Sequence, residues 1–288
     1  MDELLSLRRL SSLTFRCVPS DRPRTRLYGG EVAAQAMLAA RATVPPGREL
    51  NSMTASFLRA GDTAVPVDYR VGVARDGGVF SARTVEASQG ERPILLLTAS
   101  FQAEERGLRH QVAAPDVPAP ERLLPVERAL AGEPALVAWI CEVMQRLRVE
   151  IRFPDAGLHR EGARVGEPVL RVWIRARGPV GDGEGRRDAA LVYLSDLLLL
   201  TAALEPHPHR IEDGDVWFAT IGHSVVMHAP WRADDWLLYE GRSDWAGAGR
   251  CLVAGRLFDR AGRLCASTSQ EGLLRVASPE GDGAGATR

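Results

Sequence analysis

Asp196 lies within the most apolar stretch of the sequence, residues 189–204, which ends at Glu205 and Pro206. The stretch contains neither glycine nor proline and is apolar on nearly every side, so it predicts a helix surrounded by protein. An ionised carboxylate in such a setting is costly unless it is paired or hydrogen-bonded. Asp196 is therefore expected to be protonated, satisfied by neighbouring groups, or retained for chemistry. The simpler alternative places Ser195 and Asp196 at a solvated edge or cap of the helix.

The composition excludes several other kinds of chemistry. All 36 basic residues are arginine, which excludes a lysine Schiff base and a P-loop phosphate site. The formal net charge of −1 gives no electrostatic reason to expect nucleic acid or an anionic membrane as a partner. The four cysteines include no Cys-x-x-Cys pair, and the six histidines show no metal-ligand spacing. We therefore expect no metal, no cofactor and no disulfide framework.

The length of 288 residues suits two domains of ordinary size with a substantial core. The N-terminus lacks the apolar core of a signal peptide, and no apolar run is long enough to span a bilayer. We expect a cytoplasmic protein without a membrane span.

Two helices, each followed by strands joined by tight turns, are expected to position the candidate residues. The first helix covers residues 31–41, begins behind Gly29 and Gly30, and has small side chains that allow close packing. The apolar stretch around Asp196 supplies the second helix. Alternating apolar side chains and turn residues predict strands at 51–59, 66–75, 79–87, 94–102, 168–176, 216–227, 236–244, 250–258 and 263–276.

The order of one helix and several antiparallel strands occurs twice, which indicates a duplicated α+β unit. The last strands of the two halves are also alike, with LTASFQ at 97–102 and ASTSQ at 266–270. We predict an N-terminal unit at 1–112, a linker at 113–165, a C-terminal unit at 166–278 and a disordered tail at 279–288.

Several short motifs occur in the order found in a known family. The N-terminal half carries YGGEVAAQA at 28–36, FLRAGD at 57–62, RDG at 75–77, FSAR at 80–83 and TASFQ at 98–102. The C-terminal half carries VWIRA at 172–176, YLSD at 193–196, ATIGHS at 219–224, WLLY at 236–239 and QEG at 270–272. Together they resemble the acyl-CoA thioesterase II family. The resemblance implies two tandem hotdog units, each an antiparallel sheet wrapped around a central helix.

The resemblance also implies a set of catalytic residues. Members of the family hydrolyse acyl-CoA to a free acid and CoA with an Asp, a Thr or Ser, and a Gln that hold a water. By motif these residues fall on Asp196, Thr220 and Gln270. A carboxylate can accept the proton of that water while a hydroxyl and an amide fix its direction. The leaving thiolate has a pKa near that of Cys, about 8.5, so a dedicated general acid is less necessary.

The tetrahedral oxyanion also needs hydrogen-bond donors. The start of a central helix offers backbone amides and a positive dipole end, so Gly29 and Gly30 are candidate substrate-binding residues across the pseudo-twofold axis from Asp196. The alternative is a tight strand-to-helix turn without a role in binding.

Guanidinium groups suit phosphates, and four arginines at strand ends could contact those of CoA. They are Arg59, Arg75, Arg83 and Arg175. Each alone is more readily explained as a solvated charge, and the sequence does not choose among them.

Gly222 departs from the family pattern, which has an Asp before the His-Ser pair at this position. Loss of that carboxylate could change the orientation of His223 or the network of water around it. Strand alternation places Thr220, Gly222 and Ser224 on one face and His223 on the other. His223 is therefore expected to be a buried structural residue.

Two other functions stay open. The absence of a carboxylate at Gly222 is compatible with a non-catalytic acyl-CoA-binding protein on the same fold. A hotdog hydratase or dehydratase would need a His and an acid facing the substrate, and the predicted orientation of His223 argues against it. The resemblance also implies a homo-oligomer with acyl-CoA as its small-molecule partner.

Overall fold

The structure, a computed structural model, describes residues 3–17, 26–154, 167–178, 180, 183, 185–209, 211, 214–232 and 234–276. Its first half contains β1 Arg8–Arg9, β2 Thr14–Cys17, α1 Gly29–Arg41, β3 Arg48–Phe57, β4 Val67–Asp76, β5 Phe80–Gln89 and β6 Arg92–Ala103. Its second half contains η1 Pro120–Arg122, α2 Val126–Ala129, α3 Pro134–Leu147, β7 Val149–Arg152, β8 Val169–Ala176, α4 Arg186–Ser195, η2 Leu199–Ala203, β9 Val216–Met227, β10 Leu237–Gly247, β11 Arg250–Phe258 and β12 Leu264–Val276. None of the described helices has the length and hydropathy needed to cross a bilayer.

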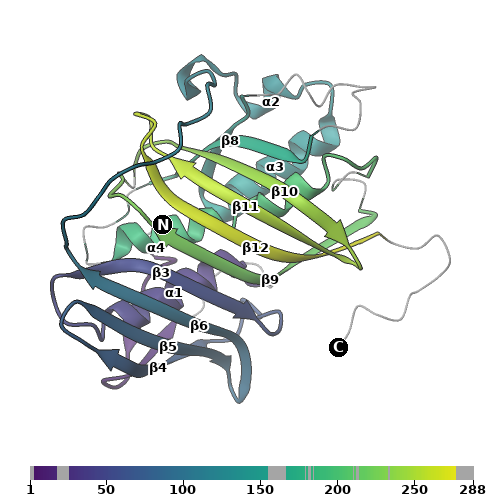
Figure 1. Cartoon of the computed structure of the whole chain (residues 1–288). Coiled ribbons are helices and arrows are strands. Elements are labelled where there is room, and N and C mark those ends of the chain that lie inside the picture. Colours follow the sequence, from purple (N-terminus) through teal and green to yellow (C-terminus); the bar gives the residue numbers. More distant parts are fainter. Residues whose placement is uncertain are drawn as a thin grey trace.

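Within the described residues, twelve strands form one antiparallel sheet around α1 and α4 (Figure 1). The strand order is β1-β2-β4-β5-β6-β3-β9-β12-β11-β10-β8-β7. β3 and β9 pair in the middle of this order, with Ser52–Ser56 opposite Val226–Gly222, and so join the two halves. The predicted α+β class, with each half wrapping one helix, is confirmed.

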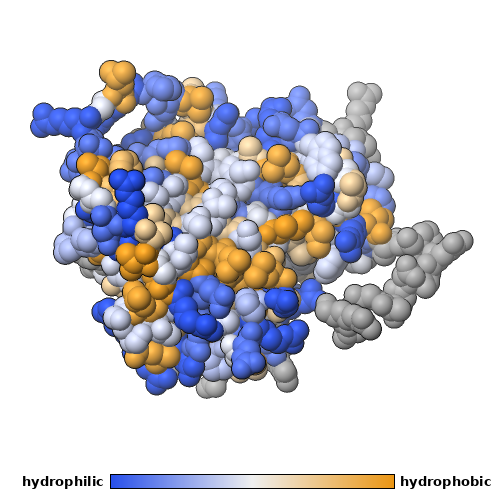
Figure 2. Space-filling view, turned by 60° about the horizontal axis from the view of Figure 1, so that its bottom comes forward, coloured by the Kyte–Doolittle hydropathy of each residue, from blue (hydrophilic) through white to orange (hydrophobic). Residues whose placement is uncertain are grey.

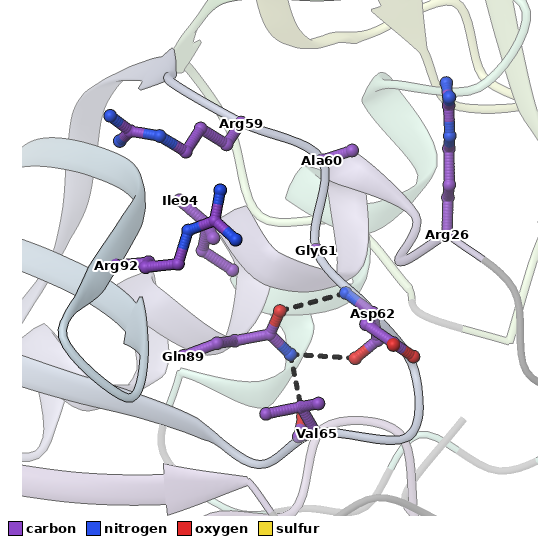
Figure 3. Close-up of a pocket in the computed structure, with 9 residues that line it drawn as sticks. All are labelled: Arg26, Arg59, Ala60, Gly61, Asp62, Val65, Gln89, Arg92 and Ile94. Atoms are coloured by element: carbon purple, nitrogen blue, oxygen red, sulfur yellow. Dashed lines mark hydrogen bonds between the residues drawn. The ribbon is translucent and has the colours of Figure 1, made fainter. Parts of the chain in front are cut away.

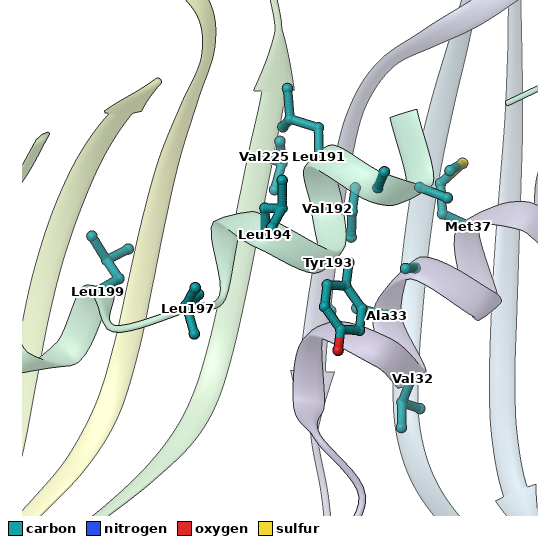
Figure 4. Close-up of a cluster of buried hydrophobic side chains, with 14 of the residues drawn as sticks. Val32, Ala33, Met37, Leu191, Val192, Tyr193, Leu194, Leu197, Leu199 and Val225 are labelled. Carbon is teal, nitrogen blue, oxygen red and sulfur yellow. The ribbon is translucent and has the colours of Figure 1, made fainter. Parts of the chain in front are cut away.

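α1 and α4 pack against each other inside the sheet (Figure 4). Ala33, Ala36 and Ala40 of α1 are fully buried, and such small side chains let two helix backbones approach closely. The apolar residues of α4 are equally buried, so the predicted core helix is buried as expected. The contact residues labelled in Figure 4 include Val32, Ala33, Met37, Leu191, Val192, Tyr193 and Leu194.

Both central strands carry a one-residue bulge. The register of β3 with β6 skips Asn51, and the register of β9 with β12 skips Ile221. An extra residue of this kind shifts the alternation of the side chains that follow it. The matching bulges support the duplication that the sequence predicts.

The prediction of one helix over residues 189–204 is wrong in length. α4 ends at Ser195, and Asp196 occupies its C-terminal cap. Leu198 then adopts a left-handed backbone, with φ at 58°, before η2 begins. Asp196 therefore lies at a break between two helical segments instead of inside one helix.

Two tyrosine hydroxyls explain the break. Tyr28 donates to the carbonyl of Tyr193 at 2.8 Å, and Tyr239 donates to the carbonyl of Ser195 at 2.6 Å. In a continuing helix both carbonyls would accept backbone amides four residues later. Hydrogen bonds from distant parts of the chain therefore replace the helical ones and end α4 directly before Asp196.

Part of the predicted linker is folded. It contains α2, α3 and β7, and β7 pairs with β8 at the edge of the sheet. Residues 155–165 of the linker and 279–288 of the predicted tail lie outside the described residues. The boundaries of the two units therefore remain a prediction.

Replacing Tyr239 by Phe tests this explanation of the helix end. The change leaves the buried carbonyl of Ser195 without its donor, so we expect the free energy of unfolding to fall by about 1–3 kcal/mol. Urea denaturation measures the loss. Thr268→Val removes only the second partner of the same hydroxyl, 3.0 Å away, and should cost less. An unchanged free energy in the Tyr239 variant would contradict the explanation.

Candidate active site

Asp196, Thr220 and Gln270 come together from the end of α4, from β9 and from β12. The Thr220 hydroxyl donates to Asp196 Oδ1 at 3.2 Å. Gln270 Nε2 donates to the same carboxylate oxygen and to Thr220 Oγ1, the second bond measuring 3.0 Å. The three residues that the resemblance selected, 74 residues apart at most, thus form one closed hydrogen-bonded group.

The other oxygen of Asp196 is held from the N-terminal half. The backbone amide of Gly30, at the start of α1, donates to Asp196 Oδ2 at 2.7 Å. A helix N-terminus favours a negative charge at this place. Gly30 of the N-terminal half thus lies next to Asp196, and its amide is bound to the carboxylate instead of being free for a substrate oxygen.

Both glycines are required by close packing. A Cβ on Gly29 would lie 2.9 Å from Asp196 Oδ2 and 3.0 Å from the Phe57 ring. A Cβ on Gly30 would lie 2.7 Å from the Tyr193 carbonyl oxygen and equally close to the Tyr28 ring. Any larger residue would push the start of α1 away from the carboxylate. The two glycines therefore serve both the tight turn before α1 and the contact of α1 with Asp196.

The surroundings raise the pKa of Asp196 from its ordinary value of 3.8 to about 7. Desolvation is the largest cause, and it outweighs the hydrogen bonds from Gly30, Thr220 and Gln270, which lower the pKa. Near neutral pH the carboxyl group therefore exchanges a proton readily. This is the property required of a general base that works at that pH.

One side of the site is accessible and the other is closed. Asp196, Thr220, Gly29 and Phe57 are partly exposed, whereas Gln270 is fully buried. Gln270 Oε1 has no hydrogen-bond partner among the described residues, so an acceptor remains next to the carboxylate. A water or substrate group can therefore reach the carboxylate from the partly exposed side, where Gly29, Phe57 and Thr220 lie.

The predicted orientation of His223 is wrong. His223 is 1 % exposed, and its Nε2 lies 2.8 Å from Ser195 Oγ beneath the helix, so it faces the same side of the sheet as Thr220. The cause is the bulge at Ile221, which interrupts simple alternation between the two residues. The prediction that His223 is buried is right. Burial lowers its pKa to about 4, which keeps the imidazole neutral.

Gly222 lies on the outer face of the sheet. It pairs with Glu271, whose side chain is 38 % exposed and binds Arg250. A Cβ at this position would meet only the carbonyl oxygen of Ala55, at 3.8 Å. The carboxylate that the family pattern has here would therefore point away from Asp196, and its loss leaves the hydrogen-bonded group intact.

Several residues that position the site were not found from the sequence. Tyr28 and Tyr239 end α4 in front of Asp196, and Ser195 connects that end to His223. Tyr28 and Tyr239 lie inside motifs noted above, but no pattern in one sequence shows which distant carbonyl a hydroxyl will meet. Their positions depend on how the two halves dock.

One sheet wrapped around two helices, with a carboxylate where the helices meet, defines the class of double-hotdog proteins. A solved structure described as a conserved protein with hot dog fold, from Alicyclobacillus acidocaldarius, shares this fold with a TM-score of 0.70 at 19 % identity, covering 96 % of this chain and 98 % of that one.

The family models are more specific than the fold. A model of the acyl-CoA thioesterase N-terminal domain matches residues 18–102, and a model of the acyl-CoA thioesterase C-terminal domain matches residues 114–274. Acyl-coenzyme A thioesterase 8 of Homo sapiens is 37 % identical over 266 residues, 88 % of this chain and 82 % of that protein. The crystal structure of an acyl-CoA thioesterase II, TesB2, from Mycobacterium marinum is 32 % identical with a TM-score of 0.77, covering 97 % and 98 % of the two chains. The chain belongs to the acyl-CoA thioesterase II family.

The raised pKa of Asp196 predicts a pH-dependent gain in stability for Asp196→Asn. Because the folded state binds this proton more tightly than the unfolded state, the contribution is complete below pH 4 and is lost as pH rises through about 7. With a pKa of about 7 in the folded state and 3.8 in the unfolded state, ionised Asp196 lowers the free energy of unfolding by at most about 4 kcal/mol at pH 8. Urea denaturation at pH 4.5 and pH 8 should therefore show a variant that gains stability mainly at the higher pH.

Asp234→Asn provides the control for that measurement. Arg232 lowers the pKa of the Asp234 carboxyl at the surface, so this substitution should give no gain at pH 8. A gain for Asp196→Asn that is equal at both pH values would show that the pKa of Asp196 is not raised.

Proposed function

We propose that Asp196, Thr220 and Gln270 activate a water molecule that hydrolyses the thioester of acyl-CoA. Membership of the acyl-CoA thioesterase II family supports the reaction class. The observation that carries the proposal is the carboxylate of Asp196, held on one oxygen by Thr220 and Gln270 and on the other by Gly30.

In the proposed reaction the water oxygen attacks the thioester carbonyl carbon while Asp196 accepts a proton from the water. Thr220 and Gln270 direct the attack, because each can hydrogen-bond both to the carboxylate and to the water. The tetrahedral intermediate then breaks its carbon–sulfur bond. The departing thiolate takes the proton back from Asp196, so the products are the free acid and CoA and the carboxylate is restored.

We assign the oxyanion to the amide of Gly29. The amide of Gly30 is used by Asp196, whereas the amide of Gly29 has no hydrogen-bond acceptor within the described part of the chain and Gly29 lies on the accessible side. Preorganised amides at a helix start stabilise an oxyanion without reorganisation during the reaction. One glycine of the predicted pair would thus bind the base and the other the substrate.

A hydratase is less well supported. Although His223 faces the same side as Thr220, it is 1 % exposed and its Nε2 is bound to Ser195. It therefore cannot touch a substrate without rearrangement. A non-catalytic binding protein would bind acyl-CoA and release no thiol, which the next experiment distinguishes.

Release of free thiol from short, medium and long acyl-CoAs tests the proposal. We expect Asp196→Asn to lower kcat by about 10²–10⁴-fold, the usual effect of removing a general base. The unmodified protein should lose activity below about pH 7, as Asp196 becomes protonated. Native protein that binds acyl-CoA without releasing thiol would reject catalysis.

Asp188→Asn is the matched control for this substitution. Asp188 lies in the first turn of the same helix, and desolvation also raises its pKa to about 7, but it makes no contact with Thr220 or Gln270. The variant should keep kcat and the pH profile. A similar loss in both variants would point to damage to α4 instead of loss of a base.

We also propose a homo-oligomer in the cytoplasm. The outer face of the sheet exposes large apolar side chains, among them Leu96, Val226 and Leu252, each more than 40 % exposed. Figure 2 shows hydrophobic residues gathered across the middle of one face, bordered by hydrophilic ones. Exposed apolar patches of this kind are typical of association surfaces.

Light scattering tests the oligomer. We expect a mass above the 31.3 kDa of one chain, and we expect Val226→Glu to lower that mass. A monomeric mass for the unmodified protein would reject the proposal.

A further inference from the structure

A cleft of about 570 Å³ opens at the end of β3, outside the carboxylate site (Figure 3). Its floor contains Gly61 and Ile94, which are buried. Gln89 fixes the loop along its edge, accepting the amide of Asp62 at 2.9 Å and donating to the carbonyls of Asp62 and Val65 at 2.7 and 2.8 Å. The cleft is therefore a formed feature of the loop.

Three guanidinium groups surround the cleft. Arg59 and Arg92 project together on one side of Gly61, and Arg26 projects on the other (Figure 3). Within the described part of the chain none of the three forms an ion pair, and Arg59 spends one N–H on the carbonyl of Pro93 at 2.9 Å. Asp62 is the one carboxylate among the lining residues, and its Oδ1 accepts the amide of Ala64 at 2.8 Å. The cleft thus carries an excess of positive charge.

The cleft is joined to the Asp196 site by two short segments. The backbones of Arg26 and Asp62 form an isolated antiparallel β-bridge, and the Leu27 amide donates to the Gly61 carbonyl at 2.9 Å, directly before α1 begins at Gly29. A Cβ on Gly61 would lie 2.6 Å from Leu27 Cδ1, so a larger residue here would displace the Leu27 side chain.

The second segment is residues 57–59. It begins at Phe57, whose ring packs close to Gly29 beside the Asp196 carboxylate, 3.0 Å from where a Cβ of Gly29 would be, and it ends at Arg59 in the cleft. The Cα atoms of Arg26 and Gly29 are at most about 11 Å apart, and those of Phe57 and Arg59 at most about 8 Å, at 3.8 Å per residue.

We propose that this cleft binds the phosphates of the 3′-phospho-ADP part of CoA through Arg26, Arg59 and Arg92, an assignment that rests on the proposed thioesterase function. The pantetheine arm with its two amides has the length of an extended peptide of roughly four to five residues, about 15 Å. The arm is longer than either backbone span from the Asp196 site to the cleft, Gly29 to Arg26 or Phe57 to Arg59, so it can join a thioester at Asp196 to phosphates in the cleft. A phosphate monoester alone carries about −1.5 to −2 charges at pH 7, which complements the three guanidinium groups that have no acidic partner among the described residues.

The structure also separates the four arginines that the sequence left equivalent. Arg83 is 1 % exposed and bound to Asp76 at 2.9 Å, and Arg175 is bound to Glu150 at 2.6 Å. Arg75 does not line the cleft. Arg59 is the one member of that set that both lines the cleft and has no acidic partner there.

The test compares two substrates with the same thioester, an acyl-CoA and the corresponding acyl-pantetheine. For Arg59→Ala and Arg92→Ala we expect KM for acyl-CoA to rise about 5- to 20-fold, with kcat little changed, because a charged contact made equally in the ground and transition states is lost. KM for acyl-pantetheine should not change. Arg232→Ala, at an exposed arginine elsewhere, should leave both substrates unaffected.

Equal changes with both substrates, or no change with acyl-CoA, would overturn the assignment while leaving thioester hydrolysis intact. Titration calorimetry with CoA itself, on Asp196→Asn with and without Arg59→Ala, gives a readout that does not depend on turnover. Weaker CoA binding in the double variant supports the cleft, and equal binding rejects it. Failure of the native protein to release thiol would reject the proposed reaction separately.

Discussion

The site depends on one constraint, the position of a single carboxylate at an interrupted helix. Asp196 is free to accept hydrogen bonds from Thr220, Gln270 and Gly30 only because α4 ends one residue earlier. The hydroxyls of Tyr28, directly before α1, and of Tyr239 in β10 cause this end, because they donate to carbonyls in the last turn of the helix. A carboxylate on a continuing helix would point along the helix surface and could not meet all three donors.

This arrangement sets a balance between stability and chemistry. Desolvation raises the pKa of Asp196 to about 7, and the three hydrogen bonds prevent a still larger rise. The folded protein therefore holds a group that destabilises it when ionised at neutral pH. Such a cost is expected where a carboxyl group is kept for proton transfer. Desolvation raises the pKa of Asp188 to the same value, so it is the hydrogen bonds to Thr220 and Gln270 that distinguish Asp196.

The two halves are duplicated but not equivalent. Their central strands share a bulge, and their helices pack against each other inside one sheet. The second half contributes the carboxylate, the hydroxyl and the amide, whereas the first contributes the helix start at Gly30 and the arginine cleft proposed for CoA. Neither half alone holds the complete site, so the join between β3 and β9 is as important to the proposed function as any side chain.

The sequence by itself determined the α+β class, most of the strands, the first helix and the family, because hydrophobic alternation, turn residues and ordered motifs are local signals. The residues of the carboxylate group also came from motifs, although sequence could not show that they touch. Only the tertiary structure decided where α4 ends, which face His223 takes after the bulge at Ile221, and which of the four candidate arginines lines the cleft without an acidic partner among the described residues. Each of these follows from a hydrogen bond, a register shift or a charge pairing between residues far apart in the chain, and periodicity carries no information about such contacts.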